Sequence, residues 1–284
     1  MNQETTNFKT FNYQENGQIA FSILSTIKTT SVLDSGLYNI ETVWDNGYKT
    51  NLSLLENIEN YNSTVPYHFK EKLDKIFKVF YDSTVKKNIN KLGYKHKVGV
   101  LLHGKQGTGK TSLLKSYFEK AYREQNAIVF NYTSLDNFSK TWDFIKGVRK
   151  IQNNPIVIFL DECDELFSKY NVENAVKVAL DGFDSIDNCI ILMSTNYIDK
   201  IPDAIKDRPS RVKYTIEVEG IQDEEVIKNF LKESFEKINM EVNLEKEISK
   251  MKGWTIDDLK QWVLDKVMDI EPEEKVNNKM GFSK

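Results

Sequence analysis

The feature that most constrains this chain is segment 104–111, which reads Gly-Lys-Gln-Gly-Thr-Gly-Lys-Thr and fits the pattern G-x-x-x-x-G-K-T. An apolar run at 98–102 precedes it, and a helix-forming run at 112–122 follows it. This order is typical of a phosphate-binding loop, because the loop amides and the positive end of the helix dipole meet at one anion. A plain glycine turn would need neither the leading strand nor the final Lys-Thr pair. The sequence therefore predicts a nucleoside triphosphate site.

Within this segment, different residues suit different parts of a nucleotide. Lys110 is expected to reach the β- and γ-phosphates, and the Thr111 hydroxyl is expected to ligate Mg²⁺. The other predicted nucleotide contacts are Gly104, Lys105, Gln106, Gly107, Thr108, Gly109 and Ser112. We therefore expect the triphosphate and its metal ion to lie at the start of the following helix.

Composition narrows the class of protein. A chain of 284 residues allows one large domain or two smaller ones, and its formal net charge of −3 argues against a surface built throughout for nucleic acid. The only two cysteines, Cys163 and Cys189, provide neither a disulfide framework nor a metal cluster. The first residues lack the pattern of a secretory signal, and no apolar run is long enough for a membrane span. We therefore expect a soluble cytoplasmic protein.

Residues 1–64 differ from the rest of the chain and are predicted to form a small β-containing region. Apolar residues at 19–24 suggest one strand, and alternating residues at 36–44 and 48–54 suggest two more. Asn46-Gly47 lies between the last two runs and favours a type I′ hairpin turn, because both central residues of that turn need positive φ. The region has no cluster with catalytic spacing, so we expect it to contact a substrate or partner.

Residues 65–220 are predicted to form an α/β domain, a parallel sheet flanked by helices. Strands are expected at 127–132, 155–160, 189–196 and 212–218, and helices at 67–81, 141–151 and 172–180. From 221 to 270 the pattern is all-helical and predicts a small helical lid, and residues 271–284 are expected to be a frayed tail.

One locally basic segment, 86–97, carries five lysines and a histidine. It could face the phosphates of a nucleic acid, or it could be a solvated linker. Since aromatic and basic residues do not alternate regularly in it, the sequence favours the solvated linker.

Polar residues follow two of the predicted core strands. Asp161, at the end of a buried strand, is expected to hold Mg²⁺, and the adjacent Glu162 is expected to be the general base for the attacking water. Asn196 ends the next strand and could position that water. Arg208 and Arg211 precede the last strand, and such guanidinium groups could complete a transition-state charge clamp from a neighbouring subunit. The alternative for this pair is a set of surface salt bridges.

The order of these motifs resembles that of the AAA family of ring-forming ATPases, within the AAA+ superfamily. The matching stretches are Gly-Lys-Gln-Gly-Thr-Gly-Lys-Thr (104–111), Val-Ile-Phe-Leu-Asp-Glu-Cys-Asp-Glu-Leu (157–166), Leu-Asp-Gly-Phe (180–183), Met-Ser-Thr-Asn (193–196), Ile-Pro-Asp-Ala-Ile-Lys-Asp-Arg-Pro-Ser-Arg (201–211) and Gly-Trp-Thr-Ile-Asp-Asp-Leu (253–259). The resemblance covers roughly residues 65–268. A looser similarity extends to virus- and bacteriophage-encoded AAA ATPases and to the mitochondrial AAA translocase subgroup.

This resemblance implies a P-loop NTPase core with ATP and Mg²⁺ as cofactors. It implies a sensor-1 role for Asn196 and arginine-finger roles for Arg208 and Arg211 across a subunit interface. It also implies a homo-oligomeric ring, usually a hexamer, that acts on a macromolecular substrate, and for a viral member the location would be the host cytoplasm.

The chain departs from the family pattern in two places, the phosphate loop and the segment after the second core strand. Lys105 and Gln106 stand where the family usually has two prolines. No arginine lies near 257–258, which agrees with the AAA family and disfavours a clamp loader or helicase loader. The aromatic pore-loop pattern is missing after the second core strand. Phe138 or Trp142 could grip a substrate there, and either could equally belong to the core.

Three functions are compatible with these features. The first is an ATP-hydrolysing ring that remodels or disassembles a protein or protein–nucleic-acid assembly. The second is a DNA-metabolism ATPase, a loader or transposition helper, that contacts DNA through residues 86–97. The third is a scaffold in which nucleotide only sets the oligomeric state, and Glu162 with the two arginines argues against it.

Overall fold

The computed structural model describes residues 10–13, 19–23, 26–30, 32–44, 47–55, 70–134, 137–169, 173–181, 185–242, 244 and 247–269. The chain divides into two compact units. The sheet unit comprises residues up to 106 and from 110 to 218, and the helical unit comprises residues 107–109 and those from 219 onward. The helical unit therefore begins beside the boundary predicted at 221.

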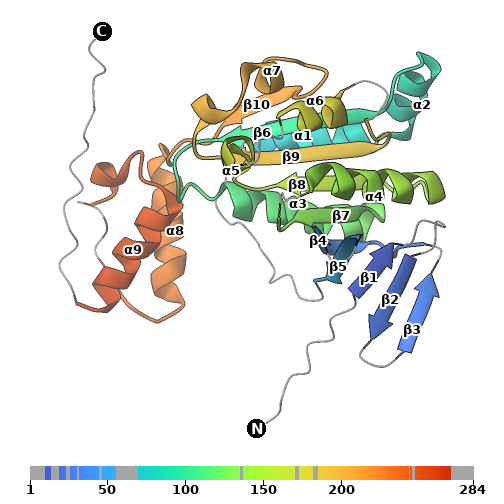
Figure 1. Cartoon of the computed structure of the whole chain (residues 1–284). Helices are drawn as coiled ribbons and strands as arrows, with labels where there is room; N and C mark the ends of the chain where they lie inside the picture. The colour runs from blue at the N-terminus through green and yellow to red at the C-terminus, as the bar shows by residue number, and fades with distance from the viewer. Residues whose placement is uncertain are drawn as a thin grey trace. The chain divides into compact units, whose positions relative to one another are not determined.

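The sheet unit is built on a seven-stranded sheet in the order β10-β6-β9-β8-β7-β4-β5 (Figure 1). Its strands are β4 (Gly36–Trp44), β5 (Tyr48–Leu54), β6 (Lys97–His103), β7 (Ile128–Tyr132), β8 (Ile156–Leu160), β9 (Cys189–Thr195) and β10 (Tyr214–Glu217). All neighbouring pairs are parallel except β4 and β5, which form an antiparallel hairpin. The predicted α/β class and the hairpin are confirmed. The predicted turn type lies partly outside the described residues, since 45 and 46 are not among them.

Helices cover both faces of this sheet (Figure 1). They are α1 (Lys70–Tyr81), α2 (Ser83–Lys91), α3 (Lys110–Gln125), α4 (Phe138–Ile151), α5 (Cys163–Lys169), α6 (Glu173–Leu180) and α7 (Asp203–Lys206), with a 3-10 turn η2 (Ile198–Lys200). On one face Phe118 of α3 packs on Phe159 of β8, with ring centroids 4.9 Å apart, and Tyr117 stacks on Phe77 of α1 at 4.5 Å. The central strands are buried on both faces, which explains their continuous apolar runs.

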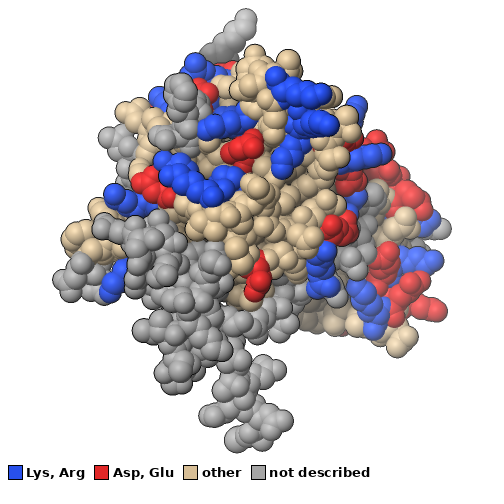
Figure 2. All heavy atoms as spheres, turned by 90° about the vertical axis from the view of Figure 1, so that its right-hand side faces the viewer, with Lys and Arg blue, Asp and Glu red and all other residues tan. Residues whose placement is uncertain are grey.

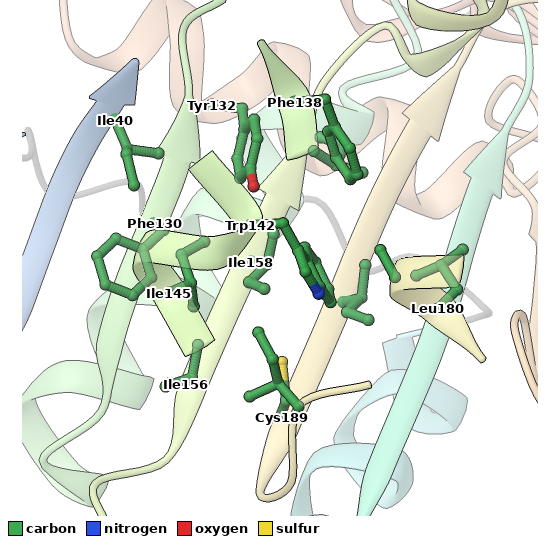
Figure 3. Close-up of a cluster of buried hydrophobic side chains, with 14 of the residues drawn as sticks. Ile40, Phe130, Tyr132, Phe138, Trp142, Ile145, Ile156, Ile158, Leu180 and Cys189 are labelled. Carbon is green, nitrogen blue, oxygen red and sulfur yellow. The ribbon is translucent and has the colours of Figure 1, made fainter. Parts of the chain in front are cut away.

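The other face is packed mainly by α4 and α6, as Figure 3 shows. Phe138 and Trp142 are only 2% and 3% exposed, and both belong to this core. They lie with Tyr132 and Ile158 between α4 and the sheet. The option that either aromatic grips a substrate is therefore wrong, because both rings are enclosed by the packing of α4.

The strands β4 and β5 belong to the main sheet and not to a separate N-terminal region. β4 pairs in parallel with β7, with Ile40 opposite Tyr132, and Ile40 is fully buried. The expected division at residue 64 thus does not follow the sheet, because a strand's sequence pattern does not specify its partner. A separate antiparallel sheet is formed by β1 (Thr10–Tyr13), β2 (Ile19–Ile23) and β3 (Thr26–Thr30).

The basic segment 86–97, for which the sequence favoured a solvated linker, is partly helical. In α2, the side chain of Asp82 accepts hydrogen bonds from the backbone N–H groups of Thr84 (2.7 Å) and Val85 (3.2 Å) and so caps the helix. No residue of α2 is buried. The helix was missed because it lacks the buried apolar stripe on which helix prediction relies.

The helical unit contains α8 (Glu224–Glu236), η3 (Ile248–Met251) and α9 (Ile256–Val267). Thr255 and Asp258 form a reciprocal capping box at the start of α9, and Phe235 of α8 packs edge-to-face on Trp262 of α9 at 6.0 Å. The predicted tail, 271–284, lies outside the described residues. None of the helices that the structure describes has the length and apolar character required to cross a membrane.

Candidate phosphate-binding and catalytic site

The glycine-rich loop connects the carboxyl end of β6 to the start of α3. Gly104, at the beginning of this loop, has φ +150°, and a Cβ atom there would lie only 2.1 Å from the carbonyl oxygen of Val218. Both the backbone conformation and the lack of space require glycine at this position. The loop is therefore held close to the backbone that follows β10.

The tip of the loop, 107–109, belongs to the helical unit. Gly107 has φ +80°, its carbonyl oxygen accepts a hydrogen bond from the Asp257 backbone N–H at 3.2 Å, and a Cβ there would lie 3.0 Å from Thr255 Oγ1. Gly109 has φ +84°. The first turn of α9 thus packs against the loop tip, so substitutions at either place should alter the loop's shape.

Lys110 is the first residue of α3, and its ammonium group lies within the loop. Nζ donates to the carbonyl oxygens of Gly104 (2.7 Å) and Lys105 (2.9 Å) and to Asn196 Oδ1 (2.7 Å). Burial lowers the pKa of Lys110, while nearby carboxylates, of which Asp161 acts most strongly, oppose that shift. The loop thus holds a buried cation where phosphate oxygens could replace carbonyl oxygens as its partners.

Thr111 and Asp161 lie together, although they come from α3 and the end of β8. The Thr111 hydroxyl lies 3.1 Å from each oxygen of the Asp161 carboxylate, and the Ser194 hydroxyl of β9 also donates to Asp161. Hydroxyl and carboxylate oxygens are the ligands that Mg²⁺ prefers. Among the described residues there is no cluster of three or more His, Cys, Asp or Glu side chains for a metal. The residues thus fit a Mg²⁺ ion that takes its other ligands from phosphate and water.

Glu162 directly follows Asp161 and has an unusual backbone conformation. Its φ is +47°, a left-handed conformation that costs a non-glycine residue about 1–2 kcal/mol. Its backbone N–H bonds to Asp161 Oδ1 (3.2 Å) and Ser194 Oγ (3.3 Å), which hold the turn, and the residue is exposed. The chain therefore turns sharply after β8, so that the Glu162 side chain is accessible while Asp161 faces Thr111.

Two supporting residues, Asp164 and Thr195, were missed in the sequence. The Thr195 hydroxyl, at the end of β9, donates to Asp164 at 2.6 Å and accepts from the Tyr197 backbone N–H at 2.9 Å. Asp164 and Thr195 are both buried. This pair fixes the chain on both sides of Asn196, whose side chain bonds Lys110. In the sequence, the last acid of Asp-Glu-Cys-Asp (161–164) is the signal that could have indicated Asp164.

The comparison with known families matches residues 100–219 to the ATPase family associated with various cellular activities (AAA). This chain carries an AAA ATPase domain. The match confirms the resemblance drawn from the motifs, and ATP with Mg²⁺ is the cofactor pair of this domain.

Three similar proteins illustrate the match. The chain is 33% identical over 149 residues to protein CdcH of Halobacterium salinarum, an alignment covering 47% of this chain and 19% of the relative. It is 33% identical over 146 residues to the proteasome-activating nucleotidase of Saccharolobus solfataricus, covering 45% and 36%. It is 29% identical over 182 residues to the ATP-dependent zinc metalloprotease FtsH of Borreliella burgdorferi, covering 56% and 27%. The aligned region thus spans about a fifth to a third of these relatives.

The two arginines predicted to act as fingers, Arg208 and Arg211, lie away from the phosphate loop. Arg208 pairs with Asp181 at 3.1 Å and Arg211 with the same carboxylate at 3.5 Å. Their turn adjoins the amino end of β6, because the Lys213 backbone N–H donates to the Gly99 carbonyl oxygen at 2.9 Å. Gly104 follows the carboxyl end of β6, and the strand between Gly99 and Gly104 is about 16 Å long. Among the described residues, no contact joins either arginine to Lys110, Asp161 or Glu162. The structure therefore assembles five predicted site residues and leaves the arginine pair apart.

Proposed function

We propose that this chain hydrolyses ATP as a subunit of a homo-oligomeric ring, and that hydrolysis drives the remodelling or disassembly of a macromolecular substrate, in the first place a protein. The observation that carries the proposal is the presence of two hydrogen-bonded pairs, Lys110 with Asn196 and Thr111 with Asp161, at one sheet edge. Glu162 directly follows Asp161. This set serves phosphate binding, metal binding and water activation. A scaffold that only binds nucleotide would not need the last of these.

Each residue has a distinct role in this proposal. Lys110 would bind the β- and γ-phosphate oxygens in place of its loop carbonyl partners. Thr111 and Asp161 would hold Mg²⁺, which would neutralise phosphate charge. Glu162 accepts a proton from the attacking water, which a carboxylate outside the metal shell can do. Asn196, already bonded to Lys110, orients the γ-phosphate or the water.

The position of the arginine pair supports action across a subunit interface. Neither arginine contacts its own phosphate loop in the described structure, yet Arg208 is 58% exposed and so is free to enter a neighbouring site. The Arg211 side chain is only 9% exposed and also donates to the Ala204 carbonyl oxygen. We therefore assign the finger role to Arg208, and to Arg211 the role of holding the turn that presents it.

The names of two relatives support a protein substrate. Relatives include the proteasome-activating nucleotidase and the 26S proteasome regulatory subunit 6B homologue, whose names place them with protein-degrading machinery. The aromatic residues at the start of α4 are buried, so a threading grip from this segment is not part of the proposal.

The test of hydrolysis is Glu162→Gln. Loss of the general base should lower ATP turnover by about 10²- to 10⁴-fold while ATP binding is retained, because the phosphate and metal ligands are untouched. The matched control is Glu165→Gln, which makes the same change at an exposed position of α5 and should leave turnover unchanged.

The same variant tests the ring. With ATP and Mg²⁺, the Glu162→Gln chain should accumulate as an oligomer in size-exclusion chromatography with light scattering, and it should retain its substrate in a pull-down. If Glu162→Gln hydrolyses ATP at the wild-type rate, Glu162 is not the general base. A variant that stays monomeric with saturating ATP would contradict the ring.

A further inference from the structure

The surface of α2 carries three lysines that form no ion pair with a carboxylate of the described residues. The sequence contains no Asp or Glu between residues 83 and 118. The helix contributes Lys86, Lys87 and Lys91, which we call the α2 lysine cluster. Figure 2 views the side of the molecule on which α2 lies, and there lysine and arginine side chains gather over much of the upper surface, with a smaller acidic area among them.

Several other helices of this chain each pair one lysine with an acid one turn away. Examples are Lys70 with Asp74 in α1, Lys177 with Glu173 in α6, and Lys232 with Glu236 in α8. In contrast, no carboxylate of the described residues forms an ion pair with Lys86, Lys87 or Lys91. The nearest acid in sequence, Asp82, is used as the helix cap.

Helix stability does not explain this arrangement. Lys87 and Lys91 are four residues apart on a nine-residue helix, and like charges at that spacing are destabilising by about 0.2–0.5 kcal/mol. Lys91 at the last turn is favoured by the helix dipole, but Lys86 and Lys87 gain nothing from it. The cluster therefore suits an external anion better than it suits the helix itself.

Two exposed side chains accompany the cluster. Leu92 is 71% exposed and Tyr94 is 69% exposed, in the turn between Lys91 and Lys95. The sequence alone favoured a solvated linker because basic and aromatic residues do not alternate there. The structure favours the other option, because Tyr94 is exposed in the turn that directly follows Lys91, and no described carboxylate pairs with Lys86, Lys87 or Lys91.

We propose that the α2 lysine cluster binds the phosphate backbone of single-stranded nucleic acid, with Tyr94 stacking on a base. Lysines that follow the backbone and an aromatic ring that takes a base form the usual combination for such strands. An anionic membrane surface fits less well, because an interfacial helix needs a broad exposed apolar face. In α2 the apolar residues Val85 and Ile89 are half-buried.

The test is the fluorescence anisotropy of a labelled oligodeoxythymidine with the full chain at increasing salt. The wild-type chain should bind at low salt and lose affinity steeply as salt rises. Replacing Lys86, Lys87 and Lys91 together by glutamine should make the slope of log affinity against log salt shallower by about 2, since each phosphate contact on a single strand contributes about 0.7. Tyr94→Ala should weaken binding by about 5- to 100-fold.

The matched control replaces Lys232, Lys250 and Lys252 by glutamine, which removes the same charge from lysines paired with Glu236, Glu247 and Glu224 in the helical unit. It should leave the affinity and the salt slope unchanged. A second variant with arginine at 86, 87 and 91 should bind like wild type, and circular dichroism confirms folding of every variant.

Three results would overturn the proposal: no binding at low salt, an equal loss in the control triple variant, or binding to phosphatidylserine vesicles without binding to the oligonucleotide. The Glu162→Gln chain should bind the oligonucleotide normally. Failure of the proposed hydrolysis therefore remains distinguishable from failure of this site.

Discussion

At the scale of single residues, the site depends on a few hydrogen bonds that fix charged groups. Lys110 is held by two loop carbonyls and by Asn196, and Asp161 is held by Thr111, Ser194 and the turn at Glu162. These contacts place the groups before any ligand binds, so little reorganisation is required when phosphate arrives.

The arginine pair gives a residue-scale prediction, because its two members differ in burial. Arg211→Ala should destabilise the chain by about 2–3 kcal/mol, since it removes charged hydrogen bonds from a nearly buried site. Arg208→Ala removes an exposed ion pair and should cost under about 1 kcal/mol, yet it should lower ATP turnover by about 10³-fold or more. Thermal melts and steady-state hydrolysis measure the two effects.

Mixing variants tests whether Arg208 acts on a neighbour. Arg208→Ala and Glu162→Gln chains should each be inactive alone, but a mixture should regain activity where an intact Glu162 faces an intact Arg208. If the mixture shows no more turnover than the separate chains, Arg208 does not act in trans. Arg208→Lys is the charge-preserving control and should not restore bidentate recognition.

At the scale of elements, the β4–β5 hairpin is joined to α4 by buried hydroxyls. Thr42 Oγ1 lies 2.8 Å from Thr50 Oγ1 across the hairpin and accepts from Thr141 Oγ1 of α4 at 2.8 Å. Asn137, immediately before α4, donates to the Thr42 carbonyl oxygen at 3.0 Å. This network fixes the hairpin to the start of α4 on the same sheet edge as the catalytic residues.

The network gives an element-scale prediction. Thr42→Val keeps the side-chain shape but leaves the hydroxyls of Thr50 and Thr141 without this partner, so it should lower the unfolding free energy by about 1–3 kcal/mol. The triple change of Thr42, Thr50 and Thr141 to valine removes all three hydroxyls and should recover much of that loss. Urea titrations followed by circular dichroism measure it, and a triple variant less stable than Thr42→Val would contradict this account.

The sequence was most informative for elements with a strong pattern and a local motif. The continuous apolar runs of β6, β8 and β9 predicted a parallel sheet, and their polar ends predicted Lys110, Thr111, Asp161 and Asn196 as neighbours. Two features depend on tertiary structure and were not predictable. They are the pairing of β4 with β7 and the difference in burial between Arg211 and Arg208. The α2 helix was missed because it buries nothing.

At the scale of the whole molecule, ligand binding should raise the free energy of unfolding. A ligand at about 100 times its Kd stabilises the folded chain by about 2.7 kcal/mol, so ATP with Mg²⁺ should raise the melting temperature. Asp161→Asn should remove most of the Mg²⁺-dependent part of this rise, because it weakens the metal site without touching Lys110. Thermal melts with ATP, with and without a chelator, measure it. Asp199→Asn, at an exposed position, is the control and should keep the full effect.

The helical unit is discontinuous in sequence, since it takes residues 107–109 from the middle of the chain and the rest from beyond 218. A protein engineer who cut the gene at codon 218 would therefore not obtain an independent nucleotide-binding module. The product would keep all the predicted catalytic side chains but would lose Thr255 and Asp257, which pack on Gly107. Domain swaps with relatives should exchange the loop tip and the first turn of α9 together.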